Sequence, residues 1–237
     1  MKISIVIPFY NEETNVGPVL REVRQTNPEA EIIAVNDGSQ DQTLAEIKKQ
    51  PDVRWISFAR NLGQSAALYT GLAHARHEIC VMMDGDGQND PADIAELVAH
   101  LDHADVVCGY RRRRRDSWPR RAASRIANAI RQAVMKDGIR DTGCTLKAMR
   151  TSAVRHLVPF NGLHRFIPAL LKNAGLRIVE IPVRHRPRTS GISKYTMARR
   201  AWRGLYDLVG VRWLMARQIP WPEGRKIGFD TTHPNCH

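Results

Sequence analysis

Residues 79–88 read ICVMMDGDGQ, an apolar run that ends abruptly in alternating aspartate and glycine. A near-continuous apolar run of this kind is typical of a strand buried on both faces of a sheet. Comparable β-branched or apolar runs lie on either side of it, at residues 3–7, 31–35, 53–58 and 105–108. Helix-like segments separate these runs. The alternation predicts an α/β fold with a mostly parallel central sheet flanked by helices.

Polar residues follow three of these predicted strands directly. The segments are Pro8 to Glu13, Asn36 to Asp41 and Asp84 to Gln88. In open sheets of parallel strands, ligands bind beyond the carboxyl ends of the strands. We therefore expect carboxylates from three strands to share one edge of the sheet and to face a ligand there.

Asp84 and Asp86 are the strongest candidates for metal ligands. Two carboxylates one residue apart can both reach a hard cation such as Mg²⁺ or Mn²⁺ only if the backbone turns, and Gly85 and Gly87 permit that turn. Such a cation could bridge the phosphates of a nucleotide donor and neutralise charge on the leaving group. A strand-ending turn rich in Asp and Gly, with no metal, is the alternative interpretation of the pair.

Four motifs in order resemble the donor half of glycosyltransferase family 2, which has a GT-A fold. They are IVIPFYNEE, VNDGSQDQT, RNLGQSAALYTGL and VMMDGDGQNDP, the last containing the counterpart of the family's DxD metal motif. Later motifs resemble the polyprenyl-phosphate branch of that family, the dolichyl-phosphate mannose synthase type. They are VVCGYRRRRRDSWPRRAASRIAN, DTGCTLKAMR, GLHRFIPALLKNAG and RTSGISKY. The resemblance extends from about residue 3 to residue 215.

The resemblance implies a role for each matching residue. The residues implied to contact the nucleotide are Pro8, Tyr10, Glu12, Asn36 and Asp37. Asn36 stands where the family often has an acidic residue. The residues implied to bind the metal are Asp84, Asp86 and Gln88. Those implied to bind the acceptor phosphate are Arg111, Arg120, Ser124, Arg188 and Lys194. Asp84, Asp86, Arg111 and Arg120 are the residues that we expect to be catalytic.

The charge of the chain agrees with a phosphorylated acceptor. The formal net charge is +12, and an arginine block lies between residues 111 and 125. A phosphate monoester is largely ionised near neutral pH, so as a nucleophile it needs no general base, only cations to bind and aim it. The planar guanidinium group of arginine suits that task. Surplus arginines would favour approach to an anionic membrane surface, at ~1 kcal/mol per residue near the surface.

The sequence predicts one GT-A domain over residues 1–218. It would comprise a nucleotide-sugar half (1–110), an acceptor half (111–194) and an amphipathic helix (195–218), followed by a loosely ordered tail (219–237). The helix carries Trp202, Leu205, Tyr206, Val209 and Trp213 on one face and Arg199, Arg203 and Arg217 along its flank. This face could lie in a membrane interface or pack on the domain's own core. A separate membrane protein could also hold the chain in place.

Several other observations restrict the class of protein. The four cysteines form no CxxC pair, which indicates reduced thiols rather than zinc or disulfides, and the first residues make a poor signal peptide. No run of 18 apolar residues is present, so we expect no spanning helix. These features favour a cytoplasmic protein that associates peripherally with the inner face of the membrane. The arginine block lacks interleaved aromatics, which argues against a nucleic-acid partner.

The sequence thus predicts an inverting glycosyltransferase. Its donor would be a UDP- or GDP-sugar, its acceptor an undecaprenyl- or dolichyl-type phosphate, and its cofactor Mg²⁺ or Mn²⁺. A family 2 enzyme with a saccharide hydroxyl acceptor is the alternative, and it would need a carboxylate base, for which Asp141 is the best candidate. His164, in GLHRFIP, is expected to be structural.

Overall fold

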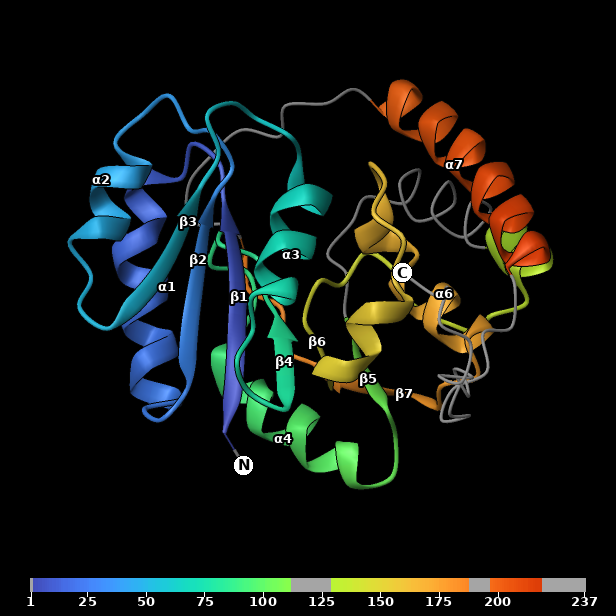
Figure 1. Cartoon of the computed structure of the whole chain (residues 1–237), viewed down its shortest axis with the longest axis horizontal. Coiled ribbons are helices and arrows are strands. Elements are labelled where there is room, and N and C mark those ends of the chain that lie inside the picture. The colour runs from blue at the N-terminus through green and yellow to red at the C-terminus, as the bar shows by residue number, and fades with distance from the viewer. Residues whose placement is uncertain (1, 112–128, 188–196, 219–237) are drawn as a thin grey trace, which may run out of the picture.

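The computed structural model describes residues 2–111, 129–187 and 197–218, with the side chains of 197–203 excepted. Its centre is a seven-stranded sheet in the order β3-β2-β1-β4-β6-β5-β7 (Figure 1). The strands are β1 (Ile3–Phe9), β2 (Glu31–Asn36), β3 (Val53–Ser57), β4 (Ile79–Met82), β5 (Val106–Arg111), β6 (Lys147–Arg150) and β7 (Ile178–Val183). All pairings are parallel except the two made by β6. The predicted α/β architecture with a mostly parallel sheet is confirmed.

Helices cover both faces of the sheet. The α-helices are α1 (Glu13–Thr26), α2 (Thr43–Lys48), α3 (Gln64–Ala73), α4 (Ile94–Ala99), α6 (Ile167–Asn173) and α7 (Met197–Arg217), and residues 129–135 are also helical. Short 3₁₀ helices are η1 (Pro91–Asp93), η2 (His100–Asp102), η3 (Thr151–His156) and η4 (Leu163–Arg165). Helices α1, α2 and α4 pack on one face, whereas α3, α6 and α7 lie over the other (Figure 1).

Side-chain alternation along the central strands divides the core into two layers. Ile5 and Ile7 of β1 face the layer that contains α1, whereas Val6 faces the layer that contains α3. All three side chains are completely buried, as the continuous apolar run predicts for a strand covered on both sides. Strand β6 is the element that no apolar run indicated, and it places Lys147 in the middle of the sheet.

Helix α7 packs on the core layer that contains α3 and α6, through a different face from the aromatic one. Leu208 and Val211 are buried in the α3 layer, whereas Tyr206 is 78% exposed, Val209 65% and Trp213 64%. The idea that the aromatic face packs on the domain's own core is therefore wrong for these described side chains. Within the described residues, no helix is long and apolar enough to cross a membrane.

The described cysteines are consistent with reduced thiols. Cys80, Cys108 and Cys144 are buried and free. Burial raises the pKa of Cys80 and of Cys108 to about 12, so both remain protonated thiols and behave as small apolar core residues. Cys236 lies outside the described residues.

Candidate active site

The candidate site lies at the carboxyl ends of β1, β2, β4 and β5. Strand β4 ends at Met82, and Asp84 and Asp86 follow in a tight loop. A Cβ atom on Gly85 would lie 2.5 Å from the ring of Phe9 and 2.7 Å from the carbonyl oxygen of Pro8, so only glycine fits there. Gly87 has φ +75°, in the left-handed region that favours glycine. The two glycines thus hold the acidic loop directly on the end of β1.

Asp84 is fixed by neighbours from two directions. The side-chain amide of Gln64, at the start of α3, donates a hydrogen bond of 2.7 Å to Asp84 Oδ1. The backbone N–H of Asp84 donates to Asn89 Oδ1 at 3.0 Å. One carboxylate oxygen is therefore anchored to α3, and the loop is closed on itself through Asn89.

The charges around Asp84 fit a divalent cation. The pKa of Asp84 is raised to about 6, first by burial and second by the negative charge of Asp86. The hydroxyl of Thr145 and the positive charges of Lys147 and Arg111 act in the opposite direction. A cation between the two carboxylates would relieve their repulsion. Among the described residues no group of three or more His, Cys, Asp or Glu side chains is placed to hold a metal. A cation bound by the two carboxylates would therefore keep coordination positions open for water or for phosphate oxygens.

Gln88 connects the acidic loop to the segment after β7. Its backbone N–H donates to Asp86 Oδ1 at 3.1 Å, and its carbonyl accepts from the backbone N–H of Arg186 at 2.9 Å. Its side-chain amide nitrogen lies 3.5 Å from His185 Nε2 and donates to the Arg186 carbonyl at 3.4 Å. The proposed metal ligand Gln88 is thus held between the acidic loop and residues 185–186.

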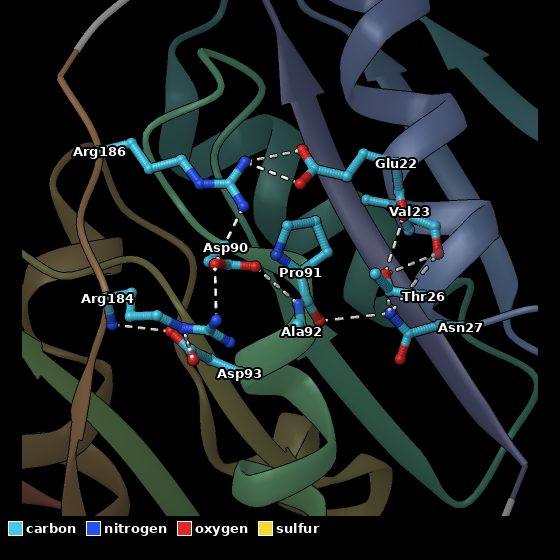
Figure 2. Close-up of polar contacts among 10 residues, drawn as sticks. All are labelled: Glu22, Val23, Thr26, Asn27, Asp90, Pro91, Ala92, Asp93, Arg184 and Arg186. Carbon is cyan, nitrogen blue, oxygen red and sulfur yellow. Dashed lines mark hydrogen bonds and ion pairs between the residues drawn. The ribbon is translucent and has the colours of Figure 1, made fainter.

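A cluster of ion pairs holds the segment after β7 against η1 and α1 (Figure 2). Arg184 binds Asp93, with Nε 2.7 Å from Oδ1, and Asp90, with Nη1 3.1 Å from Oδ2. Arg186 binds Asp90 at 2.9 Å and Glu22 at 2.7 Å. The charge of Arg186 is neutralised by these acids. The cluster fixes residues 184–186, directly after β7. Arg188 and Lys194 lie outside the described residues.

Asn36 and Asp37 shape the rim at the end of β2. Both side chains are buried. Asp37 accepts hydrogen bonds from the backbone N–H groups of Leu62 (2.8 Å) and Gly63 (3.0 Å) and from the Asn61 amide (2.9 Å). Burial raises the pKa of Asp37, and these hydrogen bonds oppose that rise. Asp37 thus holds the 61–63 turn in place, whereas Asn36 donates to Ser57 Oγ at 2.9 Å and accepts from the backbone N–H of Ser39 at 3.2 Å. The contact of both residues with a nucleotide stays a prediction.

The loop after β1 carries the other predicted nucleotide contacts. Pro8 lies in β1, and Tyr10 and Glu12 are partly exposed just beyond it. The backbone N–H of Glu12 donates to Thr43 Oγ1 at 2.8 Å, and that of Asn11 donates to Ser39 Oγ at 3.0 Å. These bonds join the loops after β1 and β2 into one ledge beside the acidic loop.

Arg111 ends β5 on the same edge of the sheet as Asp84. Its guanidinium forms a two-pronged ion pair with Asp141, with Nε 2.7 Å from Oδ2 and Nη2 2.8 Å from Oδ1. Arg111 is near enough to Asp84 to lower the pKa of that carboxyl. The structure thus brings Asp84 and Arg111 together, whereas Arg120 and Ser124 lie outside the described residues. Asp141, the candidate base for a hydroxyl acceptor, is bound to Arg111.

The sequence of the chain matches the model of a known protein family. The model of the family described as "Glycosyl transferase family 2" matches residues 4–158, which is more than half of the chain. The chain belongs to glycosyl transferase family 2. The predicted family and the prediction of a glycosyltransferase are confirmed.

Two relatives of this glycosyltransferase are named for polyprenyl-phosphate substrates. The dodecaprenyl-phosphate galacturonate synthase of Rhizobium johnstonii is 35% identical over 91% of this chain and 68% of the relative. The undecaprenyl-phosphate 4-deoxy-4-formamido-L-arabinose transferase of Edwardsiella ictaluri is 35% identical over 87% of this chain and 66% of the relative. The chain thus spans about two thirds of the length of each.

Solved structures confirm the GT-A fold. Glucosyl-3-phosphoglycerate synthase from Mycobacterium tuberculosis, crystallised with Mn²⁺, UDP-glucose and phosphoglyceric acid, superposes with a TM-score of 0.68. It is 19% identical, over 88% of this chain and 80% of that one. TarS of S. aureus gives a TM-score of 0.62 at 18% identity, over 93% of this chain and 67% of that one.

Sequence reasoning missed several residues of this glycosyltransferase's site. Gln64 belongs to the motif RNLGQSAALYTGL, and Lys147 belongs to DTGCTLKAMR, but neither residue type signals a neighbour for Asp84. The partners of Arg184 and Arg186 come from α1 and η1, far away along the chain. These contacts join residues that are distant in the chain and that become neighbours only in the folded protein.

His164 joins η4 to α3, in agreement with the expected structural role. Its Nδ1 lies 2.8 Å from Ser65 Oγ, which also accepts the backbone N–H of Gly162 at 3.0 Å. Its pKa is lowered from 6.5 to about 3, first by burial and then by the charges of Arg165 and Lys147. The neutral imidazole is therefore the form that the fold accommodates.

This shift predicts a pH dependence of stability. Between about pH 6.5 and pH 3 the unfolded chain binds a proton at His164 that the folded protein rejects, so acidification across that window lowers the free energy of unfolding. We expect His164→Gln to lessen this acid sensitivity in urea unfolding at pH 7 and pH 5. His103→Gln, at an exposed position in the loop before β5, is the control. Equal acid sensitivity of wild type and His164→Gln would contradict the prediction.

Proposed function

We propose that this glycosyltransferase transfers a sugar from a nucleotide-sugar to a polyprenyl phosphate, with inversion at the anomeric carbon. The observation that carries the proposal is that Asp84 and Asp86 follow β4 and Arg111 ends β5 on the same edge of the sheet, where the charge of Arg111 acts on Asp84. Carboxylates that can hold a divalent cation thus share this edge with an arginine that can bind a phosphate. The names of the two relatives support a polyprenyl-phosphate acceptor.

The donor half of the proposal rests on the acidic loop. Asp84, Asp86 and Gln88 would hold Mg²⁺ or Mn²⁺, which would neutralise the diphosphate leaving group. The ledge formed by the loops after β1 and β2 would hold the nucleoside of a UDP- or GDP-sugar, through Pro8, Tyr10, Glu12, Asn36 and Asp37. The crystallisation of a structural neighbour with Mn²⁺ and UDP-glucose supports this arrangement.

The acceptor half rests on the arginines and requires no general base. An ionised phosphate oxygen is already a nucleophile, so the protein has to position and desolvate it. We propose that Arg111, with Arg120, Ser124, Arg188 and Lys194, does this, in an acceptor half over residues 111–194. The engagement of Asp141 with Arg111 disfavours a hydroxyl acceptor, because that carboxylate would have to leave its ion pair to act as a base.

A solvent-partition assay tests the proposal. Purified protein would be incubated with Mn²⁺, radiolabelled UDP- and GDP-sugars and a polyprenyl phosphate, and then extracted with organic solvent. We expect label in the organic phase, none with EDTA, and none when the free polyprenyl alcohol replaces its phosphate. Transfer to the alcohol, or no lipid-linked label with any donor, would refute the proposed acceptor.

We also propose that α7 binds the inner face of the membrane. Leu205, Tyr206, Val209 and Trp213 form an exposed apolar stripe on α7, and Arg212 and Arg217 are exposed beside it. Aromatic side chains flanked by arginines are typical of helices that lie in an anionic interface. A separate membrane protein as a further anchor remains part of this proposal.

Lipid co-sedimentation checks the role of α7. The wild-type protein is expected to sediment with vesicles that contain anionic lipid at low salt, and less with neutral vesicles. Replacing Tyr206 and Trp213 by serine should weaken binding at least about tenfold, because burial of one large apolar side chain contributes roughly 1.5–3 kcal/mol. Trp55→Ser, an exposed tryptophan on edge strand β3, is the matched control. If the amount of sedimented protein changed neither with lipid charge nor with the α7 substitutions, this role would be refuted.

A further inference from the structure

Lys147 is a fully buried lysine next to the candidate site. It begins β6, between β4 and β5, and its relative exposure is 0%. Lysine is among the residue types that are almost never fully buried unless paired, because an ammonium group loses its hydration there. A lysine buried in the centre of a sheet therefore needs a compensating interaction.

Strand register places Lys147 beneath Asp84. Lys147 lies opposite Met82 on β4 and Cys108 on β5. Side chains at paired positions point to the same face, and Met82 and Cys108 both belong to the layer covered by α3. Asp84 is two residues beyond Met82, and it is bound by Gln64 from α3 on that same side of the sheet.

The hydrogen-bond partner of Lys147 carries no charge. Its Nζ donates a hydrogen bond to the carbonyl oxygen of Cys144, which is neutral. Within the part of the chain that the structure describes, no carboxylate forms an ion pair with it. Its positive charge nevertheless acts on Asp84, whose pKa it lowers. Asp84 is thus the carboxylate on which the Lys147 ammonium acts.

We propose that Lys147 is a positioning residue that holds the Asp84 carboxylate in place and offsets the net negative charge of the site when the cation and the nucleoside diphosphate are bound. This inference rests on the proposed function. With Asp84, Asp86, a divalent cation and a nucleoside diphosphate assembled, the site carries net negative charge. Lys147 supplies a positive charge from inside the sheet, and Arg111 supplies one at the rim.

Gln64 and Lys147 would then have separate tasks. Gln64 orients Asp84 through a neutral hydrogen bond to Oδ1. Lys147 acts through charge from below and does not touch substrate, because it has no exposed surface. A residue that only fills the core would be replaceable by an apolar side chain of the same length. A positioning cation would not be.

Two substitutions separate these roles. Lys147→Met keeps the length of the side chain and removes the charge, and with it the cost of keeping an ammonium group out of water, so the fold should persist. We expect Lys147→Met to melt cooperatively but to bind UDP about tenfold more weakly than wild type in the presence of Mn²⁺, because one favourable charge interaction is lost. Lys147→Arg should recover most of the affinity. Lys172→Met, which removes an exposed lysine that also donates to a carbonyl, is the control and should bind like wild type.

Calorimetric titration of UDP, with GDP in parallel, measures these affinities without any acceptor. Wild-type affinity in Lys147→Met, or equal weakening in Lys147→Arg, would overturn the inference. A crystal structure of Lys147→Met gives a readout independent of the nucleotide: we expect Asp84 to leave its hydrogen bond to Gln64, and an unmoved Asp84 would also overturn it. A wild-type protein that binds nucleotide with Mn²⁺ but never labels a lipid would refute the proposed acceptor and leave the role of Lys147 standing.

Discussion

Asp86→Ala is expected to reduce sugar transfer by about 10³-fold or more, equivalent to roughly 4 kcal/mol of transition-state stabilisation. The loss follows because one of the two carboxylates that can hold the cation is removed, and with it the neutralisation of the leaving diphosphate. Asp86 lies in a partly exposed loop outside the hydrophobic core, so the fold should persist. The measurement is the initial rate of lipid labelling at saturating donor and acceptor.

The control for this prediction is Asp102→Ala, at an exposed aspartate of η2. It should transfer sugar at the wild-type rate. Circular dichroism melting of both variants would show whether each remains folded. Wild-type turnover in a folded Asp86→Ala would contradict a role for a metal at this loop.

Arg111→Lys is expected to raise the KM for polyprenyl phosphate by about 10- to 100-fold, or roughly 1.4–2.7 kcal/mol. Lysine keeps the charge but lacks the planar fork that can bind a phosphate through two hydrogen bonds. The affinity for UDP with Mn²⁺ should change little, because the donor is held by the other half of the site. Steady-state kinetics with varied acceptor, together with a UDP titration, measure both effects.

Arg177→Lys is the matched control, because Arg177 also faces an aspartate, Asp105, but just before β7, at the opposite edge of the sheet from the site. It should leave the KM unchanged. If Arg111→Lys bound the acceptor like wild type, or lost donor affinity to the same degree, Arg111 would have no specific role in holding the acceptor phosphate.

Much of the fold could be predicted from the sequence because the central strands are buried on both faces. Near-continuous apolar runs such as residues 3–7 and 79–83 are typical of strands in that environment. Strand β6 could not be predicted, since KAMR is short and starts with a lysine. Its position between β4 and β5 depends on pairing with strands distant in sequence.

The aromatic face of α7 illustrates a second limit. The helix has two apolar stripes, one with Leu208 and Val211 and one with Tyr206, Val209 and Trp213. Helical periodicity identifies both stripes but does not decide which one meets the core. The buried stripe is the one that contacts the α3 layer.

The candidate site was predictable where its residues follow strands directly. Asp84 and Asp86 end an apolar run, and parallel strands bring such ends to one edge. The neighbours of Asp84 were not predictable in the same way. A lysine such as Lys147 is ordinarily a surface charge, and the pairing of Arg186 with Glu22 joins residues far apart in the chain.

Diffraction from crystals grown with Mn²⁺ and UDP tests the central claim most directly, because the anomalous signal of manganese locates the ion without assumptions about the protein. We expect one anomalous peak within coordination distance of the Asp84 and Asp86 carboxylates, bridged to the diphosphate and on the same edge of the sheet as Arg111. Bound UDP with no manganese beside these two carboxylates, or manganese held elsewhere, would contradict the claim.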